Sequence, residues 1–244
     1  MIKAAIEKIE QMARPNTLYI GDEVYTDKKL YRLDKEQLAD PIKITTLSSL
    51  VEYLKTCGED MKDGNPGNYF IRIDSPTMVT VLSKLNRDRD REKLIVCEAE
   101  VPRIPFEHFI DSEQMVITLQ SMFVDEPEKT DKALILKFAG TVTSGSVKEY
   151  DDDGVTQKAT IKQGVVSKQE AIVPSPCTLR PFRTFVEIEQ PASSFIFRMK
   201  EGSSGNVTSA LIEADGGAWK IKARESIKKY LEEKLEGMPI SIIG

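Results

Sequence analysis

The stretch Leu179-Arg-Pro-Phe-Arg-Thr-Phe-Val-Glu-Ile-Glu-Gln-Pro-Ala-Ser-Ser-Phe-Ile-Phe-Arg-Met199 carries the most specific structural information in this chain. It contains two strand-like runs, 185–189 and 194–199, separated by Gln-Pro-Ala. Apolar and polar residues alternate in both runs, which is typical of strands that bury one face. We expect these runs and residues 209–213 to form successive antiparallel strands in a β-rich core with one charged face.

The remaining sequence predicts an α+β protein with predominantly antiparallel sheets, an N-terminal helix, one or two central helices and a C-terminal amphipathic helix. Apolar spacing and capping residues predict helices over residues 2–13, 46–57, 112–123 and 218–236. Strands are expected at 18–25 (a hairpin), 69–73, 78–82, 94–101, 147–161 (a hairpin) and 239–243. Residues 131–142 fit either a helix or a strand. From residue 144 onward the sequence pattern becomes mainly strand-like, which suggests an N-terminal region 1–143 and a C-terminal region 144–244. The two regions could also form one continuous domain.

Composition excludes several classes of function. The chain has 244 residues and a formal net charge of -5, so it offers no extended positive field for nucleic acid. Its three cysteines are far apart and show no metal-ligand spacing, which is typical of a reducing compartment. No apolar run approaches the ~20 residues of a membrane helix, and residues 1–14 do not resemble a secretory signal. We therefore expect a cytoplasmic protein with no membrane partner.

The first helix presents an apolar stripe of Ile2, Ile6, Ile9 and Met12. Such a stripe can serve as an oligomerisation arm, or it can lie on the helix's own domain, which is the interpretation we favour. If the stripe is an oligomerisation arm, we expect the chain to bind copies of itself and form a homo-oligomer.

No catalytic apparatus is recognisable. His108 is the only histidine, and neither a nucleophile elbow nor a phosphate loop nor a zinc-protease motif occurs. We interpret His108 as a structural or surface residue and expect a non-enzymatic protein without a cofactor.

Arginine and aromatic residues suggest a ligand site. Guanidinium groups pair with phosphate in a bidentate manner and aromatic faces stack on bases, so we expect these residues to bind a small anionic ligand such as a nucleotide. The candidates are Arg180, Arg183, Arg198, Phe182 and Trp219.

Four carboxylates near these arginines are weaker candidates for a Mg²⁺ or Mn²⁺ site, namely Glu187, Glu189, Glu213 and Asp215. Salt bridges to Arg183 and Arg198 explain the same acids more simply, and we favour them. Asp215-Gly-Gly also precedes the last helix, where either a capped start or a small anion site would fit; we favour the cap.

The order of these segments, with Leu-Arg-Pro-Phe-Arg-Thr-Phe-Val-Glu-Ile-Glu-Gln-Pro followed by Glu-Ala-Asp-Gly-Gly-Ala-Trp, resembles the YfdQ-like family of uncharacterised phage and prophage proteins. The likeness is sharpest over residues 172–231 and looks like the variant from phages of Gram-positive bacteria. It implies a phage accessory protein acting in the infected host cell, and it implies no catalytic residues.

Two functional hypotheses follow. The first is a homo-oligomeric accessory protein that binds a small anionic ligand or a host protein, with the countering of host defence as the expected role. The second is a single-stranded nucleic-acid partner in recombination or replication, which the acidic composition disfavours. A self-assembling structural shell protein would have the same sequence features.

Overall fold

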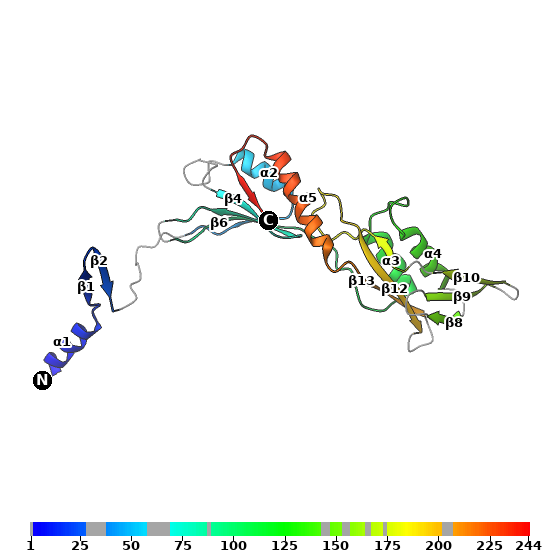
Figure 1. The fold of residues 1–244 in the computed structure, drawn as a ribbon, viewed down its shortest axis with the longest axis horizontal. Helices are drawn as coiled ribbons and strands as arrows, with labels where there is room; N and C mark the ends of the chain where they lie inside the picture. Colours follow the sequence, from blue (N-terminus) through cyan, green and yellow to red (C-terminus); the bar gives the residue numbers. More distant parts are fainter. Residues whose placement is uncertain are drawn as a thin grey trace. The chain divides into compact units, whose positions relative to one another are not determined.

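The computed structural model describes two compact units, Met1–Leu38 and Ala39–Gly244 (Figure 1). The described residues are 2–27, 38–57, 69–86, 89–142, 147–152, 157–163, 167–172, 175–201 and 207–244. The α+β class expected from the sequence is confirmed. None of the described helices is long and apolar enough to cross a membrane.

The first unit consists of a helix and a hairpin. Helix α1 spans Ile2–Ala13, and the antiparallel strands β1 (Thr17–Ile20) and β2 (Glu23–Thr26) follow it. Gly21 takes a φ of +64° in the turn, a conformation that favours glycine. Both elements were predicted from the sequence, and both are confirmed.

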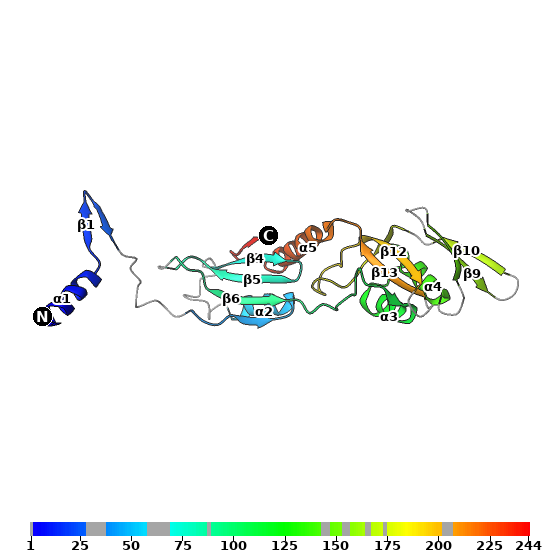
Figure 2. The same ribbon diagram turned by 90° about the horizontal axis from the view of Figure 1, so that it is seen from below.

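A five-stranded sheet in the second unit has the order β14-β4-β5-β6-β3. Figure 2 shows β4, β5 and β6 side by side; these three strands are antiparallel, whereas the edge strands β3 and β14 pair in parallel. The strands span Ile42–Ile44 (β3), Tyr69–Ser75 (β4), Met78–Ser83 (β5), Lys93–Glu98 (β6) and Ser241–Ile243 (β14).

Helices α2 (Leu47–Thr56) and α5 (Ala218–Lys234) cover one face of this sheet (Figure 1). The Thr46 hydroxyl caps α2 by accepting a hydrogen bond from the Ser49 N–H at 3.2 Å. Leu50 and Leu54 of α2 and Ile227 of α5 are buried against the sheet. The apolar spacing of the last helix suggests a stripe of Trp219, Ile221, Ile227, Leu231 and Leu235, but Ile221 is 64% exposed, whereas Ala223 is buried in the core.

A four-stranded sheet with the order β11-β12-β13-β7 forms a second core with helices α3 and α4. Its elements are β7 (Ile110–Asp111), α3 (Ser112–Met122), α4 (Lys132–Val142), β11 (Cys177–Leu179), β12 (Ser193–Glu201) and β13 (Val207–Glu213). Phe195, Phe197 and Met199 of β12 are buried here, as the alternation predicted. Of the ambiguous residues 131–142, Lys132–Val142 form helix α4.

Strands β8 (Val147–Asp152), β9 (Gln157–Gln163) and β10 (Ser167–Ile172) form a three-stranded antiparallel sheet. The hairpin predicted over 147–161 corresponds to β8 and β9. The region boundary suggested at residue 144 falls outside the described residues and stays a prediction. In the described structure, β7 pairs with β13, so residues from both suggested regions share one sheet.

One predicted strand is wrong. Residues 185–189 belong to an irregular segment between β11 and β12, in which Phe185 and Ile188 both point into the core with α2 and α5 while Val186 is 74% exposed. A buried pair three residues apart fits a turn of chain and not the two-residue period of a strand. Apolar alternation alone did not distinguish the two.

Candidate functional site

The segment between β11 and β12 is organised around the buried side chain of Gln190. Its Oε1 atom accepts hydrogen bonds from the N–H groups of Arg183 (3.0 Å) and Thr184 (3.3 Å), and its Nε2 atom donates to the carbonyl of Phe185 (3.0 Å). These bonds satisfy backbone groups that have no strand partner. The loop that carries both predicted arginines is therefore fixed from within.

Arg180 is buried, with its side chain only 5% exposed. Its Nε atom donates to the Gln190 carbonyl at 2.8 Å, and its two terminal nitrogens form ion pairs with Glu126 and Glu189. Burial acts to lower the pKa of Arg180, but hydrogen bonds with Glu189 and Glu126 outweigh it, and the pKa is raised. This guanidinium is a charged group held by two internal carboxylates.

Arg183 is equally buried and lies at the centre of a second network. It pairs with Glu213 at 2.6 Å, donates to the Ser193 hydroxyl and lies over the Trp219 ring at 3.9 Å from the ring centroid. Burial lowers the pKa of Arg183 to about 10, against the opposing effect of Glu213 and Asp215. The side chain remains cationic at neutral pH and binds α5 to the four-stranded sheet.

Asp215 occupies the start of α5. Burial acts to raise its pKa, but hydrogen bonds from the Ser193 hydroxyl (2.6 Å) and from the N–H groups of Gly217 (3.0 Å) and Trp219 (3.3 Å) lower it overall. These N–H groups are among those that would bind an anion at a helix N-terminus. An internal carboxylate therefore takes the place of the small anion considered from the sequence.

The remaining predicted ligand residues do not join this cluster. Arg198 lies on the opposite face of β12 from Phe197 and Met199, is half-buried and has an interaction within the structure. Arg183 instead contacts Ser193 and Phe195. The side chains of these two β12 residues lie on the face of the sheet opposite Arg198, because successive side chains of a strand alternate between the two faces. Phe182 is half-buried and lines neither cavity described below.

The four candidate metal-binding carboxylates have separate partners. Glu187 accepts hydrogen bonds from Ser48 at the start of α2, Glu189 pairs with Arg180, Glu213 pairs with Arg183 and Asp215 accepts from Ser193. Within the described residues, no group of three or more histidine, cysteine or acidic side chains could hold a metal ion. His108 is exposed, and its Nδ1 atom lies 2.7 Å from the Phe106 carbonyl.

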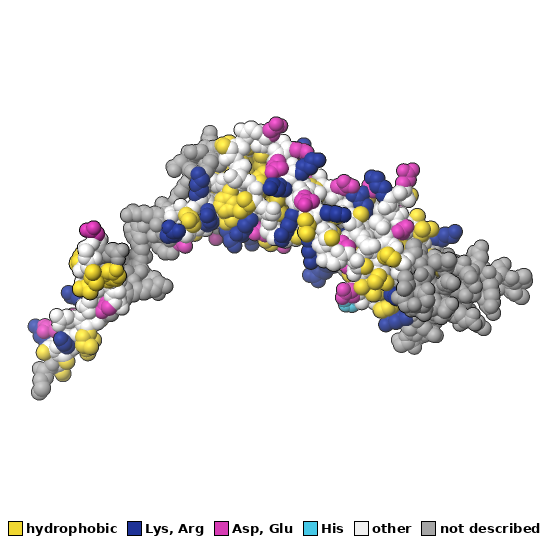
Figure 3. All heavy atoms as spheres, in the orientation of Figure 1, with side chains coloured by type: hydrophobic (Ala, Val, Ile, Leu, Met, Phe, Trp, Pro, Cys, Tyr) yellow, Lys and Arg dark blue, Asp and Glu magenta, His cyan; other side chains and the backbone are white. Residues whose placement is uncertain are grey.

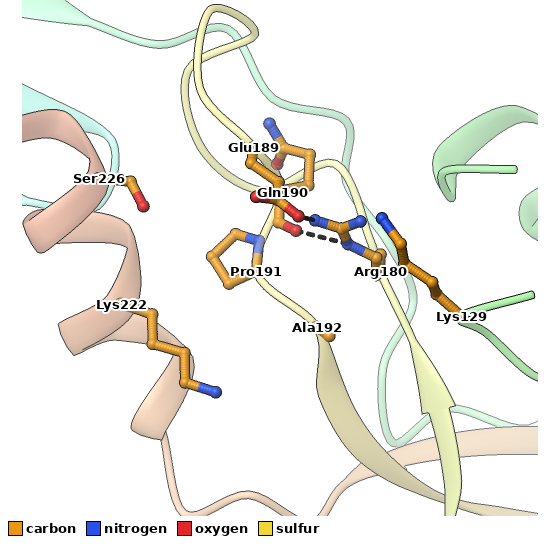
Figure 4. Close-up of a pocket in the computed structure, with 8 residues that line it drawn as sticks. All are labelled: Lys129, Arg180, Glu189, Gln190, Pro191, Ala192, Lys222 and Ser226. Atoms are coloured by element: carbon orange, nitrogen blue, oxygen red, sulfur yellow. Dashed lines mark hydrogen bonds and ion pairs between the residues drawn. The ribbon is translucent and has the colours of Figure 1, made fainter. Parts of the chain in front are cut away.

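A cavity of about 290 Å³ lies between the Arg180 loop and α5 (Figure 4). Lys129 lines one side next to Arg180, and Lys222 and Ser226 of α5 line the other, with Pro191 between them. A second cavity of about 270 Å³ shares Ala192 and Lys222 with it and reaches Trp219 and Asp215.

Sequence reasoning missed the residues that fix this site. Glu126 is 54 positions from Arg180, and Gln190 and Ser193 have no motif that marks them. Lys129 and Lys222 belong to ordinary charged runs. A comparison of the chain with protein-family models, curated proteins and solved structures found no match.

Proposed function

We propose that this chain is a non-enzymatic structural protein that assembles with copies of itself through its N-terminal unit. The observation that carries the proposal is the exposure of that unit: every one of its residues whose burial is described is exposed. The exposed fractions are 79% for Ile2, 66% for Ile9, 70% for Met12 and 72% for Tyr19. In the phage setting that the family resemblance implies, such a protein would be a scaffold or shell component.

The physical argument concerns the stability of small elements. An isolated helix of fewer than about 12–15 residues is marginal in water, and so is an isolated two-stranded hairpin. Helix α1 has 12 residues and β1–β2 is a two-stranded sheet, and neither has a buried core among the described residues. Figure 3 shows hydrophobic side chains on the surface of this unit. Exposed apolar side chains gathered in this way are stabilised when another protein surface covers them.

The interior arrangement bears on the alternative function, in which the arginines bind a ligand. Both buried arginines form ion pairs with carboxylates of the same chain, and this favours a role inside the fold over a role as free ligand-binding groups.

The test is the oligomeric state of the full chain by size exclusion with light scattering. We expect a mass that is a multiple of 27.4 kDa, and a shift to 27.4 kDa in an Ile9→Asp variant. Gln11→Asp is the matched control, because it introduces the same charge on the opposite side of α1 and should leave the assembly intact. A wild-type chain that stays at 27.4 kDa at high concentration would overturn the proposal.

A second candidate function is binding of a small anionic ligand at the two cavities beside α5. Lys222 lines both cavities, and its ammonium group forms no ion pair or hydrogen bond with any described residue. The buried indole N–H of Trp219 also has no hydrogen-bond partner among the described residues. Calorimetry with a mononucleotide and a cyclic dinucleotide tests it. Binding that Lys222→Ala removes and Lys228→Ala retains would support it, and no heat with either compound would exclude these ligands.

A further inference from the structure

Helix α1 has the apolar spacing of a short coiled-coil seam. The seam consists of Ile2, Ile6 and Ile9 of the apolar stripe together with Ala13, which recur at intervals of four, three and four residues, and Met12 lies at its edge. This spacing keeps apolar side chains on one stripe when two helices pack along their length. The helix is about 18 Å long, so two of the four seam residues lie on each side of its midpoint.

Two opposite charges border this stripe on one flank. Lys3 and Glu10 are seven residues apart, and seven residues bring an α-helix back to within about 20° of the same direction. Lys3 is near the beginning of the helix and Glu10 is near its end. Neither is engaged in an ion pair with a described residue.

The opposite flank carries no such pair. It presents Ala5 and Met12 next to the stripe, with Lys8 farther round. In a parallel helix pair, the Lys3 flank of one helix faces the Ala5 flank of the other, so the charges would meet methyl and thioether groups. In an antiparallel pair like flanks face each other, and Lys3 of each helix meets Glu10 of the other.

We infer that α1 pairs with α1 of a second copy in antiparallel orientation, with two symmetric Lys3–Glu10 contacts that set the register. This inference rests on the proposed self-association and adds the partner surface and its geometry. The pair obeys a two-fold axis, as most homodimer contacts do, and Met12 of one helix packs near Ala5 of the other. Antiparallel packing also opposes the two helix dipoles favourably.

The inference is tested by charge reversal in the full chain, with dissociation constants from sedimentation equilibrium. Lys3→Glu and Glu10→Lys each place like charges together at two symmetric points, so each should weaken association about tenfold at low salt. The double variant restores opposite charges and should lie within about twofold of wild type. Lys8→Glu is the control, since it makes the same charge change as Lys3→Glu away from the seam and should have little effect.

Failure of the inference and failure of the proposed function are distinguishable. If the wild type associates but the double variant is as weak as the two single variants combined, the antiparallel register is wrong and self-association stands. If the wild type is monomeric, both are wrong, and the stripe covers a surface of its own chain or of another protein.

Cross-linking provides a second measurement of orientation. In a Cys57→Ser background, a mixture of Lys3→Cys chains and Glu10→Cys chains should form a disulfide-linked dimer. Neither variant alone should form this dimer, because the introduced cysteines of two identical chains lie at opposite ends of an antiparallel helix pair. Equal cross-linking in all three samples would overturn the inference.

Discussion

Replacing Arg183 with alanine measures whether the buried guanidinium is a structural element. The side chain is 7% exposed, pairs with Glu213 at 2.6 Å and stacks on Trp219 at 3.9 Å. Arg183→Ala removes both contacts and leaves the Glu213 carboxylate without its cation.

The expected cost follows from burial. Breaking a buried ion pair by removing one partner costs about 3–5 kcal/mol, and a cation over an aromatic ring adds about 0.5–2 kcal/mol. Glu213 is 31% exposed, so water partly solvates the carboxylate that remains. We therefore expect a loss of about 3 kcal/mol in the free energy of unfolding, which is the lower end of the range for the ion pair alone.

Urea unfolding followed by the fluorescence of Trp219, the single tryptophan, and by circular dichroism is the appropriate assay. A loss of about 3 kcal/mol moves the midpoint by roughly 1 M urea. Arg72→Ala is the matched control: Arg72 pairs with Asp74 at the same distance of 2.6 Å, but its side chain is 45% exposed. Exposed pairs contribute about 0–1 kcal/mol.

The reasoning is refuted if the two substitutions cost the same, because burial would then not decide the value of the pair. An Arg183→Ala protein as stable as wild type would also return the guanidinium to the list of ligand candidates.

Two further predictions concern ionisation and thiol reactivity. Because the folded pKa of Asp215 is lowered, its carboxylate stabilises the fold above the unfolded value of about 3.9, and this contribution is lost as the pH falls through the folded pKa. Asp215→Asn should lower the melting temperature at pH 7, with the difference from wild type closing below about pH 4; a constant difference would contradict the assignment. Cys97 and Cys177 are 0% exposed, and burial raises the pKa of each thiol to about 12, so a thiol reagent should label only Cys57 in the native protein and all three cysteines in denaturant.

Local patterns predicted most of the helices and strands because each depends on neighbours in sequence. The α2 helix has a capping threonine and an apolar face with a helical period, and the β5–β6 hairpin has alternating apolar residues with a charged turn. Residues 185–189 misled the same reasoning because Gln190 supplies hydrogen bonds that a strand partner would otherwise give. The edge strand β3 is too short to show a period.

The candidate site was predicted only in part. Arg183 and Trp219 are in contact, as the shared pocket required, but the sequence could not show that Glu213 and Ser193 already hold the guanidinium. Strand register decides which acid meets which arginine, and register depends on pairing between segments far apart in the chain. The apolar stripe of α1 was visible from the sequence, but the sequence pattern does not say which surface covers it.

The chain order of the five-stranded sheet has a consequence during biosynthesis. Strands β4 to β6 end at Glu98, whereas α5, which shares the cover of their apolar face with α2 through Ile227 and Leu231, ends at Lys234. At typical translation speeds the ribosome needs roughly 10–30 s to make the intervening residues. During that interval the part of the sheet that α5 later covers exposes apolar side chains to solvent. A chaperone that binds this apolar surface would raise the yield of native protein.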